Sequence, residues 1–468
     1  MGDMEGAPGS DAGASATGLS LADGAPATVD PAMPAIQPRT LKGFCDFPPA
    51  LALQRERMVE VARGVYRSYG FAPIDTPALE LAEVLLAKVD PGAEIARQLY
   101  RFVDNGGRDV VLRFDLTVPF ARFAAMHVQE LGTPFKRYQV GSVWRGENTQ
   151  AGRYREFLQC DFDTIGTTSG AADVEVALVI HDLLVALGFE RFTVRISDRH
   201  VLAGVLEVLG VGERAGPVLR SVDKLAKHGP DVVRSELVDA VGLDDGQAAA
   251  VLEVAGSDLA TVADRFGGSE RVAAGVARLR ELFAVADAVG IPEGRLVVDL
   301  SISRGLDYYT GTVYETFLSD LPAIGSVCSG GRYDDLAGLY TSQSLPGVGA
   351  SLGLDRLLAA MEELGVVGTE PTGAAVLFVR FAGVALADLH GLAAEVRRAG
   401  FGAEVYPDLK KVGAQLQLAE RREARVAVLA GPAELADGVV KVKDLAARTE
   451  ATVPRAGLVE EIRRVVHG

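Results

Sequence analysis

Hydrophobic and polar positions follow two different periods in the first part of the chain. Over residues 51–69 apolar side chains recur every three or four positions, which predicts an amphipathic helix that ends at Gly70. Short apolar runs between turn-rich loops predict strands. We expect those strands at 110–112, 137–144, 156–165 and 192–196, and a further helix at 173–187.

The pattern changes after residue 198. From 199 to about 290, Leu, Val and Ala recur at helical spacing with almost no strand signal, which predicts a helical insertion. Strand-like runs return at 296–302, 312–317 and 325–328, and residues 347–364 are predicted to be helical, with a strand-to-helix join near the glycines at 349–353.

The last part of the chain alternates strands with helices. A short Pro/Gly segment at 370–373 reads as a linker. Alternation at this spacing predicts a small α/β domain. Its strands are expected at 376–380, 403–406, 425–429 and 439–443, and its helices at 386–398, 412–421 and 458–466.

Composition limits the class of protein. Residues 1–38 are mostly Ala, Gly, Pro, Ser and Asp, too polar to offset chain entropy, so we expect a disordered tail, with Met33 as an alternative start. No apolar run approaches the roughly 18 residues that would span a bilayer, so no membrane span is predicted. The three cysteines have no C-x-x-C spacing, which fits a reducing, cytoplasmic location.

The charge is strongly negative. The 468 residues include 47 Lys and Arg against 63 Asp and Glu, a formal net charge of −16. This excludes a generally basic surface but leaves room for a local basic patch that meets nucleic acid. Residues 375–468 hold 14 Lys and Arg against 12 Asp and Glu, so that segment is slightly positive. There Lys410–Lys411 and Arg421–Arg422 are either solvated faces or phosphate contacts.

Common catalytic motifs are mostly missing from the sequence. The glycine pairs at 330–331 and 347–349 lack the Lys-Ser/Thr ending of a P-loop, and the six histidines form no H-E-x-x-H motif. Residues 349–353 match the G-x-S-x-G pattern of a nucleophile elbow, which makes Ser351 a minor candidate.

Two polar strands rich in arginine offer better chemistry. Arg145 and Glu147 follow the first strand, and Arg153 and Phe157 begin the second after a Gly-containing loop. Guanidinium groups are always charged and match phosphate oxygens in pairs, so this hairpin could hold a triphosphate with Phe157 against its base. From these residues alone, an exposed hairpin with solvated arginines is an equal alternative.

Five ordered blocks of sequence extend this interpretation. The hairpin resembles motif 2 of class II aminoacyl-tRNA synthetases, residues 347–357 resemble motif 3, and residues 70–80 resemble motif 1, with Pro77 at the dimer-forming strand. The segment Ser-Arg-Gly-Leu-Asp-Tyr-Tyr-Thr-Gly at 303–311 is similar to the signature loop of the histidyl-tRNA synthetase family, and Ser-Gly-Gly-Arg-Tyr-Asp at 329–334 matches another block of that family.

The resemblance implies a fold and a domain plan. It implies a class II synthetase antiparallel sheet flanked by helices, in an α+β core, with a helical insertion and a C-terminal α/β anticodon-binding domain. The expected parts are a tail (1–38), the first part of the catalytic core (39–198), the insertion (199–290), the second part of the core (291–369), and the linker with the anticodon-binding domain (370–468). A homodimer is also implied.

The resemblance also assigns roles to individual residues. Arg145 and Arg304 would be catalytic, holding the α-phosphate of ATP and the amino-acid carboxylate. The ATP site would further use Glu147, near Mg²⁺, together with Arg153, Phe157 and Arg356. Asp115, Thr117 and Gln159 would bind the ammonium group of L-histidine, and Asp163 and Tyr309 would bind its imidazole. Tyr308 is also included as a histidine-binding residue, although packing is the commoner role for such a tyrosine.

The expected activity is ATP-dependent formation of histidyl-adenylate and transfer of the histidyl group to the 3′ end of tRNA(His). Two alternatives stay open: an inactive regulatory subunit of ATP phosphoribosyltransferase, and an uncharged-tRNA-binding module. Asp115 stands where many relatives have glutamate, and the loop 146–149 differs from the frequent H-E-R-P form, which suggests a separate subgroup.

Overall fold

The computed structural model describes residues 36–87, 94–149, 152–302, 308–366 and 373–467. The chain divides into two units, Met1–Leu41 and Lys42–Gly468. Among the described residues, helices and strands occur only in the second unit.

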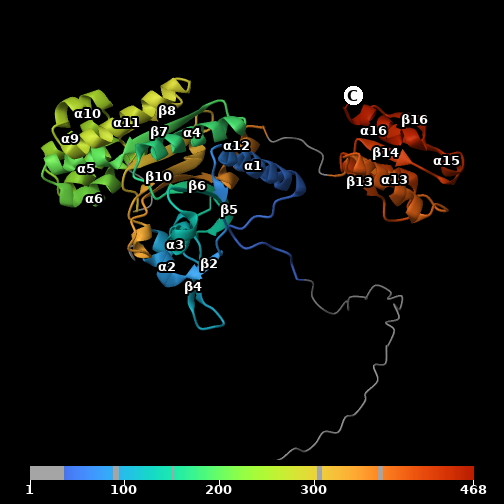
Figure 1. Cartoon of the computed structure of the whole chain (residues 1–468), viewed down its shortest axis with the longest axis horizontal. Helices are drawn as coiled ribbons and strands as arrows, with labels where there is room; N and C mark the ends of the chain where they lie inside the picture. Colours follow the sequence, from blue (N-terminus) through green and yellow to red (C-terminus); the bar gives the residue numbers. More distant parts are fainter. Residues whose placement is uncertain (1–35, 88–93, 150–151, 303–307, 367–372, 468) are drawn as a thin grey trace, which may run out of the picture. The chain divides into compact units, whose positions relative to one another are not determined.

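An eight-stranded sheet forms the centre of the larger part (Figure 1). Its six inner strands are antiparallel, and the two edge strands pair in parallel with their neighbours. The core of the sheet is therefore antiparallel, as expected from the sequence, and each edge strand adds one parallel pair. The strands, in spatial order, are β1 (Ala72–Pro73), β5 (Phe135–Trp144), β6 (Glu156–Ile165), β11 (Gly347–Gly353), β10 (Cys328–Tyr333), β9 (Thr312–Leu318), β7 (Phe192–Asp198) and β8 (Leu296–Val298).

Three helices pack against one face of this sheet: α1 (Pro49–Ser68), α4 (Gly170–Ala186) and α12 (Leu354–Glu363). The buried side chains of α1 recur at helical spacing, which explains why this segment folds as an amphipathic helix. Arg55 of α1 forms an ion pair with Asp355 of α12 at 2.7 Å, and Asp355 also accepts a hydrogen bond from the Leu158 amide of β6 at 2.8 Å. These contacts fix the start of α12 against the sheet.

A smaller sheet and two helices form a second apolar cluster. The strands, in order, are β2 (Leu79–Leu81), β4 (Asp109–Leu112) and β3 (Arg101–Val103), and the helices are α2 (Ala82–Leu86) and α3 (Thr117–Leu131). Phe114, Phe120 and Leu336 are buried in this cluster, and Tyr308 and Tyr309 pack against it. The cluster therefore places the two tyrosines of the signature loop next to α3.

The predicted insertion region is helical in the structure. Its helices are α5 (Arg199–Val208), α6 (Ala215–Val222), α7 (Leu225–His228), α8 (Pro230–Asp239), α9 (Asp245–Ala255), α10 (Leu259–Phe266) and α11 (Glu270–Ala288). Side chains at the N-caps of α9, α10 and α11 accept backbone N–H bonds, as helix starts require.

The C-terminal part has its own five-stranded sheet and two apolar clusters. Helices α13 (Leu386–Arg398) and α16 (Leu458–His467) contribute to one cluster, and α14 (Val412–Arg421) contributes to the other. The strand order is β13 (Ala403–Val405), β12 (Val376–Val379), β14 (Val426–Leu429), β15 (Val439–Asp444) and β16 (Thr449–Pro454). The alternation in the sequence predicted four of these strands and missed β16, whose residues are mostly exposed and have little apolar signal.

The predicted helix at 347–364 is partly wrong. Residues 347–353 form strand β11, and the helix begins only at Leu354. The glycines of this strand are needed for close packing, since a Cβ on Gly347 would lie 2.3 Å from the Tyr333 ring and one on Gly349 would lie 2.2 Å from Asp163 Oδ1. The strand predicted at 296–302 is shorter, Leu296–Val298, and the one predicted at 325–328 begins later, as Cys328–Tyr333.

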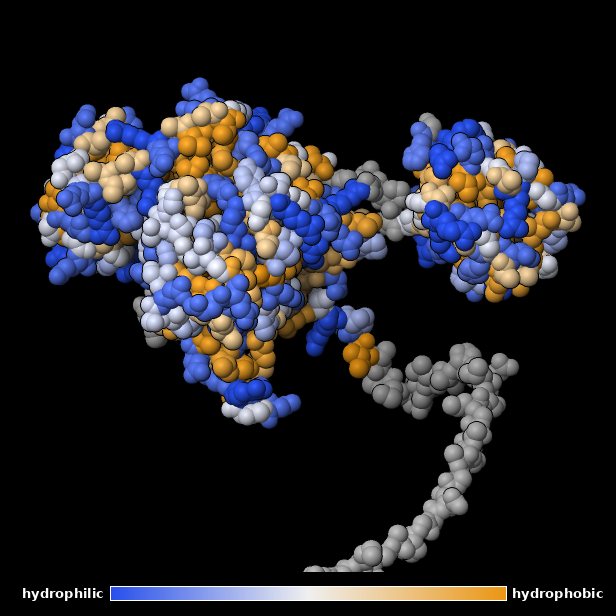
Figure 2. All heavy atoms as spheres, viewed as in Figure 1, coloured by the Kyte–Doolittle hydropathy of each residue, from blue (hydrophilic) through white to orange (hydrophobic). Residues whose placement is uncertain are grey.

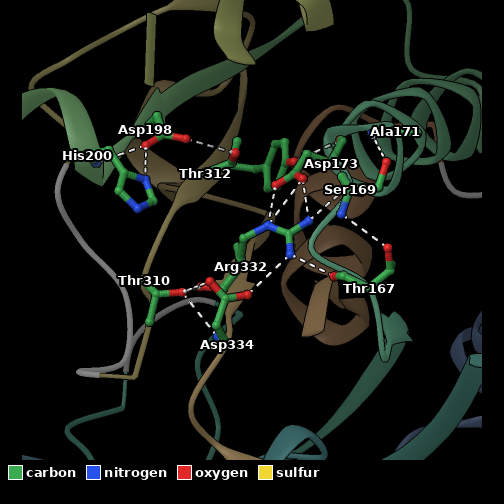
Figure 3. A network of polar contacts seen from close by, with 11 residues as sticks. Thr167, Ser169, Ala171, Asp173, Asp198, His200, Thr310, Thr312, Arg332 and Asp334 are labelled. Atoms are coloured by element: carbon green, nitrogen blue, oxygen red, sulfur yellow. Dashed lines mark hydrogen bonds and ion pairs between the residues drawn. The ribbon is translucent and has the colours of Figure 1, made fainter. Parts of the chain in front are cut away.

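A buried ion pair ties α4 to the sheet (Figure 3). Arg332 of β10 and Asp173 of α4 are 1% and 0% exposed, and Arg332 Nε donates to Asp173 Oδ1 at 3.0 Å. The other guanidinium nitrogens donate to the backbone oxygens of Thr167 and Ser169, both at 3.0 Å, and to Asp334 Oδ1 at 3.2 Å. The guanidinium is therefore well satisfied where no water reaches it.

Removing one partner should leave an uncompensated buried charge. We expect Asp173→Ala to lower the free energy of unfolding of the core by about 3–5 kcal/mol. Urea unfolding followed by fluorescence of Trp144, the only tryptophan, measures this on the core itself. Glu60→Ala is the control, because it removes an exposed partner of Arg63 and should change stability by less than about 1 kcal/mol. Equal effects of the two substitutions would contradict the structural role of Arg332.

Candidate functional site

Strand β6 supplies one wall of a cavity. Side chains alternate along a strand, so Cys160 and Phe162 face the helices, where both are fully buried in the main core. Gln159, Asp161 and Asp163 therefore share the opposite face. The register pairs Asp163 with Gly349 of β11 and with Arg137 of β5.

The cavity has a volume of about 480 Å³ and collects most of the predicted site. Nine predicted residues line it, contributed by β6, α3, α12, the β5–β6 hairpin and the segment before β9. They are Asp115, Thr117, Arg145, Glu147, Arg153, Gln159, Tyr308, Tyr309 and Arg356.

Asp115 is held by two hydrogen bonds. Its Oδ1 accepts the Val118 amide at 3.1 Å and its Oδ2 accepts the Tyr308 hydroxyl at 3.2 Å. Burial raises the pKa of Asp115 to about 6, against the opposing effects of the Val118 amide and of nearby Arg145. Tyr308, expected mainly as a packing residue, thus both lines the cavity and orients a carboxyl group.

Asp163 lies deeper, behind the lining residues. It is 2% exposed, forms an ion pair with Arg137 at 2.7 Å and accepts a hydrogen bond from Tyr333 at 2.6 Å. Burial raises its pKa, and the positive charge of Arg137 opposes that rise. The hydrogen bond from Tyr333 could not be found from the sequence, because it joins two strands that are distant along the chain.

Three arginines line the same cavity. Arg145 Nε donates to the Phe114 carbonyl at 2.8 Å, which positions its guanidinium beside α3. Arg153 lies 3.6 Å from Glu147, and Arg356 Nη1 donates to the Ser326 carbonyl. A guanidinium carries five N–H donors in a planar fork that matches phosphate oxygens in pairs, so three such groups suit a triphosphate.

Gly152 explains how two of these arginines come together. Its φ of +67° is in the left-handed region, and a Cβ there would lie 3.0 Å from the Cα of Arg356. Only glycine allows the hairpin to approach α12 so closely, so Arg153 and Arg356 meet at one place.

The two other predicted residues are Phe157 and Arg304. Phe157 does not line the cavity; its ring packs under the guanidinium of Arg145 at 5.2 Å from the ring centroid. Arg304 lies outside the described residues, as does the rest of 303–307.

Asp161 was missed by sequence reasoning. It lines the cavity between Gln159 and Asp163 and is 1% exposed. Burial raises its pKa to about 7, with Asp163 adding to the rise and Arg137 and Ser351 opposing it. The two-residue period of β6 could have identified it, since an aspartate at 161 must share the face of residues 159 and 163.

Ser351 has no elbow geometry. It lies inside β11, two residues before the strand ends, and its hydroxyl accepts a hydrogen bond from Gln159 Nε2 at 2.7 Å. A nucleophile elbow needs the serine on a sharp turn from strand to helix. The nucleophile interpretation is therefore rejected.

Comparison with known proteins shows the family of the chain. A family model described as histidyl-tRNA synthetase matches residues 43–357, and one described as an anticodon binding domain matches residues 375–465. The chain belongs to the histidyl-tRNA synthetase family. This confirms the family predicted from the signature blocks and the class of enzyme that goes with it.

Relatives in this family match over nearly their whole length. The chain is 53% identical over 424 residues to a histidine–tRNA ligase of Rhodopirellula baltica, covering 89% of this chain and 96% of the relative. It is 44% identical to that of Treponema denticola, covering 92% and 98%. Among solved structures, the histidyl-tRNA synthetase of Nostoc sp. PCC 7120 aligns with a TM-score of 0.81 at 33% identity, covering 92% of this chain and 100% of that one.

The raised pKa of Asp161 predicts a pH dependence of stability. The folded protein binds the proton more tightly than the unfolded chain, so the contribution of Asp161 to stability is complete below pH about 4 and is lost as pH rises through about 7. Asp161→Asn cannot titrate. The difference in free energy of unfolding, variant minus wild type, should therefore increase by a few kcal/mol between pH 4 and pH 8. This estimate takes roughly 1.4 kcal/mol for each unit by which the pKa is raised. Urea unfolding of both proteins at each pH, followed by Trp144 fluorescence, measures the difference; a constant difference would contradict the shift.

Proposed function

We propose that the chain activates L-histidine with ATP in this cavity and then transfers the histidyl group to tRNA(His). The observation that carries the proposal is the joint lining of one cavity by buried carboxyl groups and by three arginines. The carboxyl groups suit the ammonium and imidazole N–H donors of an amino acid, and the arginines suit a triphosphate.

The first step brings two anions together. The histidine carboxylate attacks the α-phosphorus, an O–P bond forms, and the bond to pyrophosphate breaks. Fixed positive groups must cancel the repulsion and stabilise the charge that develops. Arg145 serves this role in the cavity, and Arg304 is assigned the same role from the signature loop. Neither needs to titrate, and no general base is required, because the attacking carboxylate is already ionised.

Roles for the remaining residues follow from their places. Arg153 and Arg356 hold the β- and γ-phosphates. The role of Phe157 against adenine rests on the motif 2 resemblance alone, because its ring packs under Arg145 and does not line the cavity. The Asp163 carboxylate accepts a hydrogen bond from one imidazole nitrogen, and the Tyr309 hydroxyl donates to the other. Tyr333 and Arg137 hold the Asp163 carboxylate in place. Asp115, Thr117 and Gln159 bind the ammonium group. In the second step the tRNA 3′ hydroxyl attacks the acyl carbon and AMP leaves.

Magnesium fits at one residue of this set. Mg²⁺ binds nucleotide sites through one or two carboxylates and the substrate phosphates. The Glu147 carboxylate lines the cavity beside Arg153, so it is the residue that would hold the ion against the triphosphate. The ion would neutralise phosphate charge there. Among the described residues, no group of three or more potential ligands forms a separate metal site.

Strand β2 supports a homodimer, because its apolar side chains are exposed and its charged side chain is buried. Leu79 and Leu81 are 38% and 41% exposed, whereas Glu80 between them is buried and paired with Arg122 at 2.6 Å. Phe102 and Val103 of β3 are exposed on the same small sheet, and Figure 2 shows apolar surface over this region. Apolar side chains turned outward around a segment that resembles the dimer-forming motif 1 favour a second copy as the partner.

The tRNA and the location complete the proposal. The domain at 375–465 matches an anticodon binding domain, so we assign it to the anticodon of tRNA(His). In it, Arg422 is paired with Glu404 and Lys410 lies 3.7 Å from Asp408, whereas Arg421 and Lys411 form none of the described ion pairs. None of the described helices is long and apolar enough to cross a membrane. A cytoplasmic location stays a prediction from the sequence.

Histidine-dependent exchange between pyrophosphate and ATP tests the activity. The full-length chain should catalyse exchange with L-histidine and show no exchange above background with the other protein amino acids, because a site of buried hydrogen bonds rejects ligands that lack the matching groups by about 10⁴ or more. An inactive regulatory subunit or a tRNA-binding module would give no exchange. That result would contradict the proposal.

A further inference from the structure

One carboxyl group in the cavity wall has no role in the proposed reaction. Asp161 is 1% exposed and lines the cavity, and its Oδ1 atom has no hydrogen-bond partner among the described residues. Its neighbours are better satisfied: Asp115 accepts two hydrogen bonds, and Asp163 is paired with Arg137. Leaving a buried carboxyl oxygen without a donor is costly, so a donor is expected to arrive from a ligand.

A second such acceptor lies two residues away on the same face of β6. Gln159 Nε2 donates to the Ser351 hydroxyl, while Gln159 Oε1 has no partner among the residues that the structure describes. Asp161 and Ser351 are directly paired across β6 and β11, so the serine lies between the two acceptors. Two adjacent acceptors that both lack a donor match a ligand group with several N–H bonds, such as an alkylammonium.

The charges around Asp161 also favour a cationic ligand group. Arg137 forms an ion pair with Asp163. None of the ion pairs among the described residues includes Asp161. Asp115 and Asp163 instead add negative potential at Asp161 and help to raise its pKa. An incoming cation would relieve that repulsion and favour the ionised carboxylate.

We propose that Asp161 accepts a hydrogen bond from the α-ammonium group of the bound amino acid and supplies its counter-charge. This inference rests on the proposed function, since it assumes that the cavity holds an amino acid. Asp161 then acts with Asp115, Thr117 and Gln159, which also line the cavity, and the three ammonium N–H bonds are shared among the oxygens of these four side chains. The residue thereby helps to select an amino acid over its deaminated analogue.

Two ligands, one with and one without the ammonium group, test whether Asp161 binds that group. L-Histidinol keeps the ammonium and imidazole groups and lacks the carboxylate; imidazole-4-propionate lacks the ammonium group. In calorimetric titrations of the full chain at pH 8, Asp161→Asn should weaken histidinol binding by about 30-fold or more, as expected for a lost charge-assisted hydrogen bond. Binding of imidazole-4-propionate should change by less than about threefold.

Asp163→Asn is the matched control. It removes the neighbouring carboxylate, which is assigned to the imidazole, and should therefore weaken both ligands. For Asp161→Asn, an unchanged histidinol affinity, or an equal loss for both ligands, would overturn the inference. A wild-type chain that binds neither histidine nor histidinol would instead count against the proposed function.

Folding of the variant is checked in the same titrations with ATP, whose affinity should stay within about twofold. Should Asp161→Asn lose ATP binding as well, Asp161→Ser replaces it as a smaller neutral variant. The ratio of the histidinol and imidazole-4-propionate dissociation constants should then rise by the same factor. An unchanged ratio in that variant would also overturn the inference.

Discussion

Burial of three carboxyl groups close to one another, those of Asp115, Asp161 and Asp163, is the constraint on which the rest of the site depends. Each has a raised pKa because water is excluded, and the neighbouring carboxyl groups raise the pKa of Asp161 further. Such an arrangement costs stability in the empty protein. A fold retains that cost where the site must receive a cationic ligand, and perturbed carboxyl groups in a cavity are typical of such sites.

The surrounding sheet offsets the constraint with fixed contacts. Arg137 reaches Asp163 from the adjacent strand, and Tyr333 reaches it from β10 because Gly349 and Gly347 of the intervening strand have no side chains. On the other side, Gly152 lets the arginine hairpin touch α12. Glycine is thus used where side chains of the site must approach closely, which links backbone geometry directly to the hydrogen bonds and charges of the cavity.

Local pattern predicted most of the elements, and tertiary contacts explain the failures. The amphipathic period of α1 and the apolar alternation of β5 and β6 were sufficient to place those elements. Strand β11 was taken for helix because its glycines carry no strand signal; their reason is the Tyr333 ring and the Asp163 carboxyl, which come from other parts of the sequence.

The same distinction applies to the site. Motif resemblance named nine residues that the fold brings to one cavity, although the segments that carry them are far apart in the chain. Asp161 was missed because no motif includes it, and its importance depends on burial and on an unpaired oxygen, which only a structure shows. Tyr308 was undervalued for a similar reason: its hydrogen bond to Asp115 crosses 193 residues of sequence.

A crystal structure of the full chain with a non-hydrolysable histidyl-adenylate analogue tests the central claim most directly. The account predicts that the histidyl group lies against β6, with its imidazole at Asp163 and its ammonium group within hydrogen-bond distance of Asp161, and that the phosphate lies against Arg145. An analogue bound in the reverse orientation, or outside this cavity, would contradict the account.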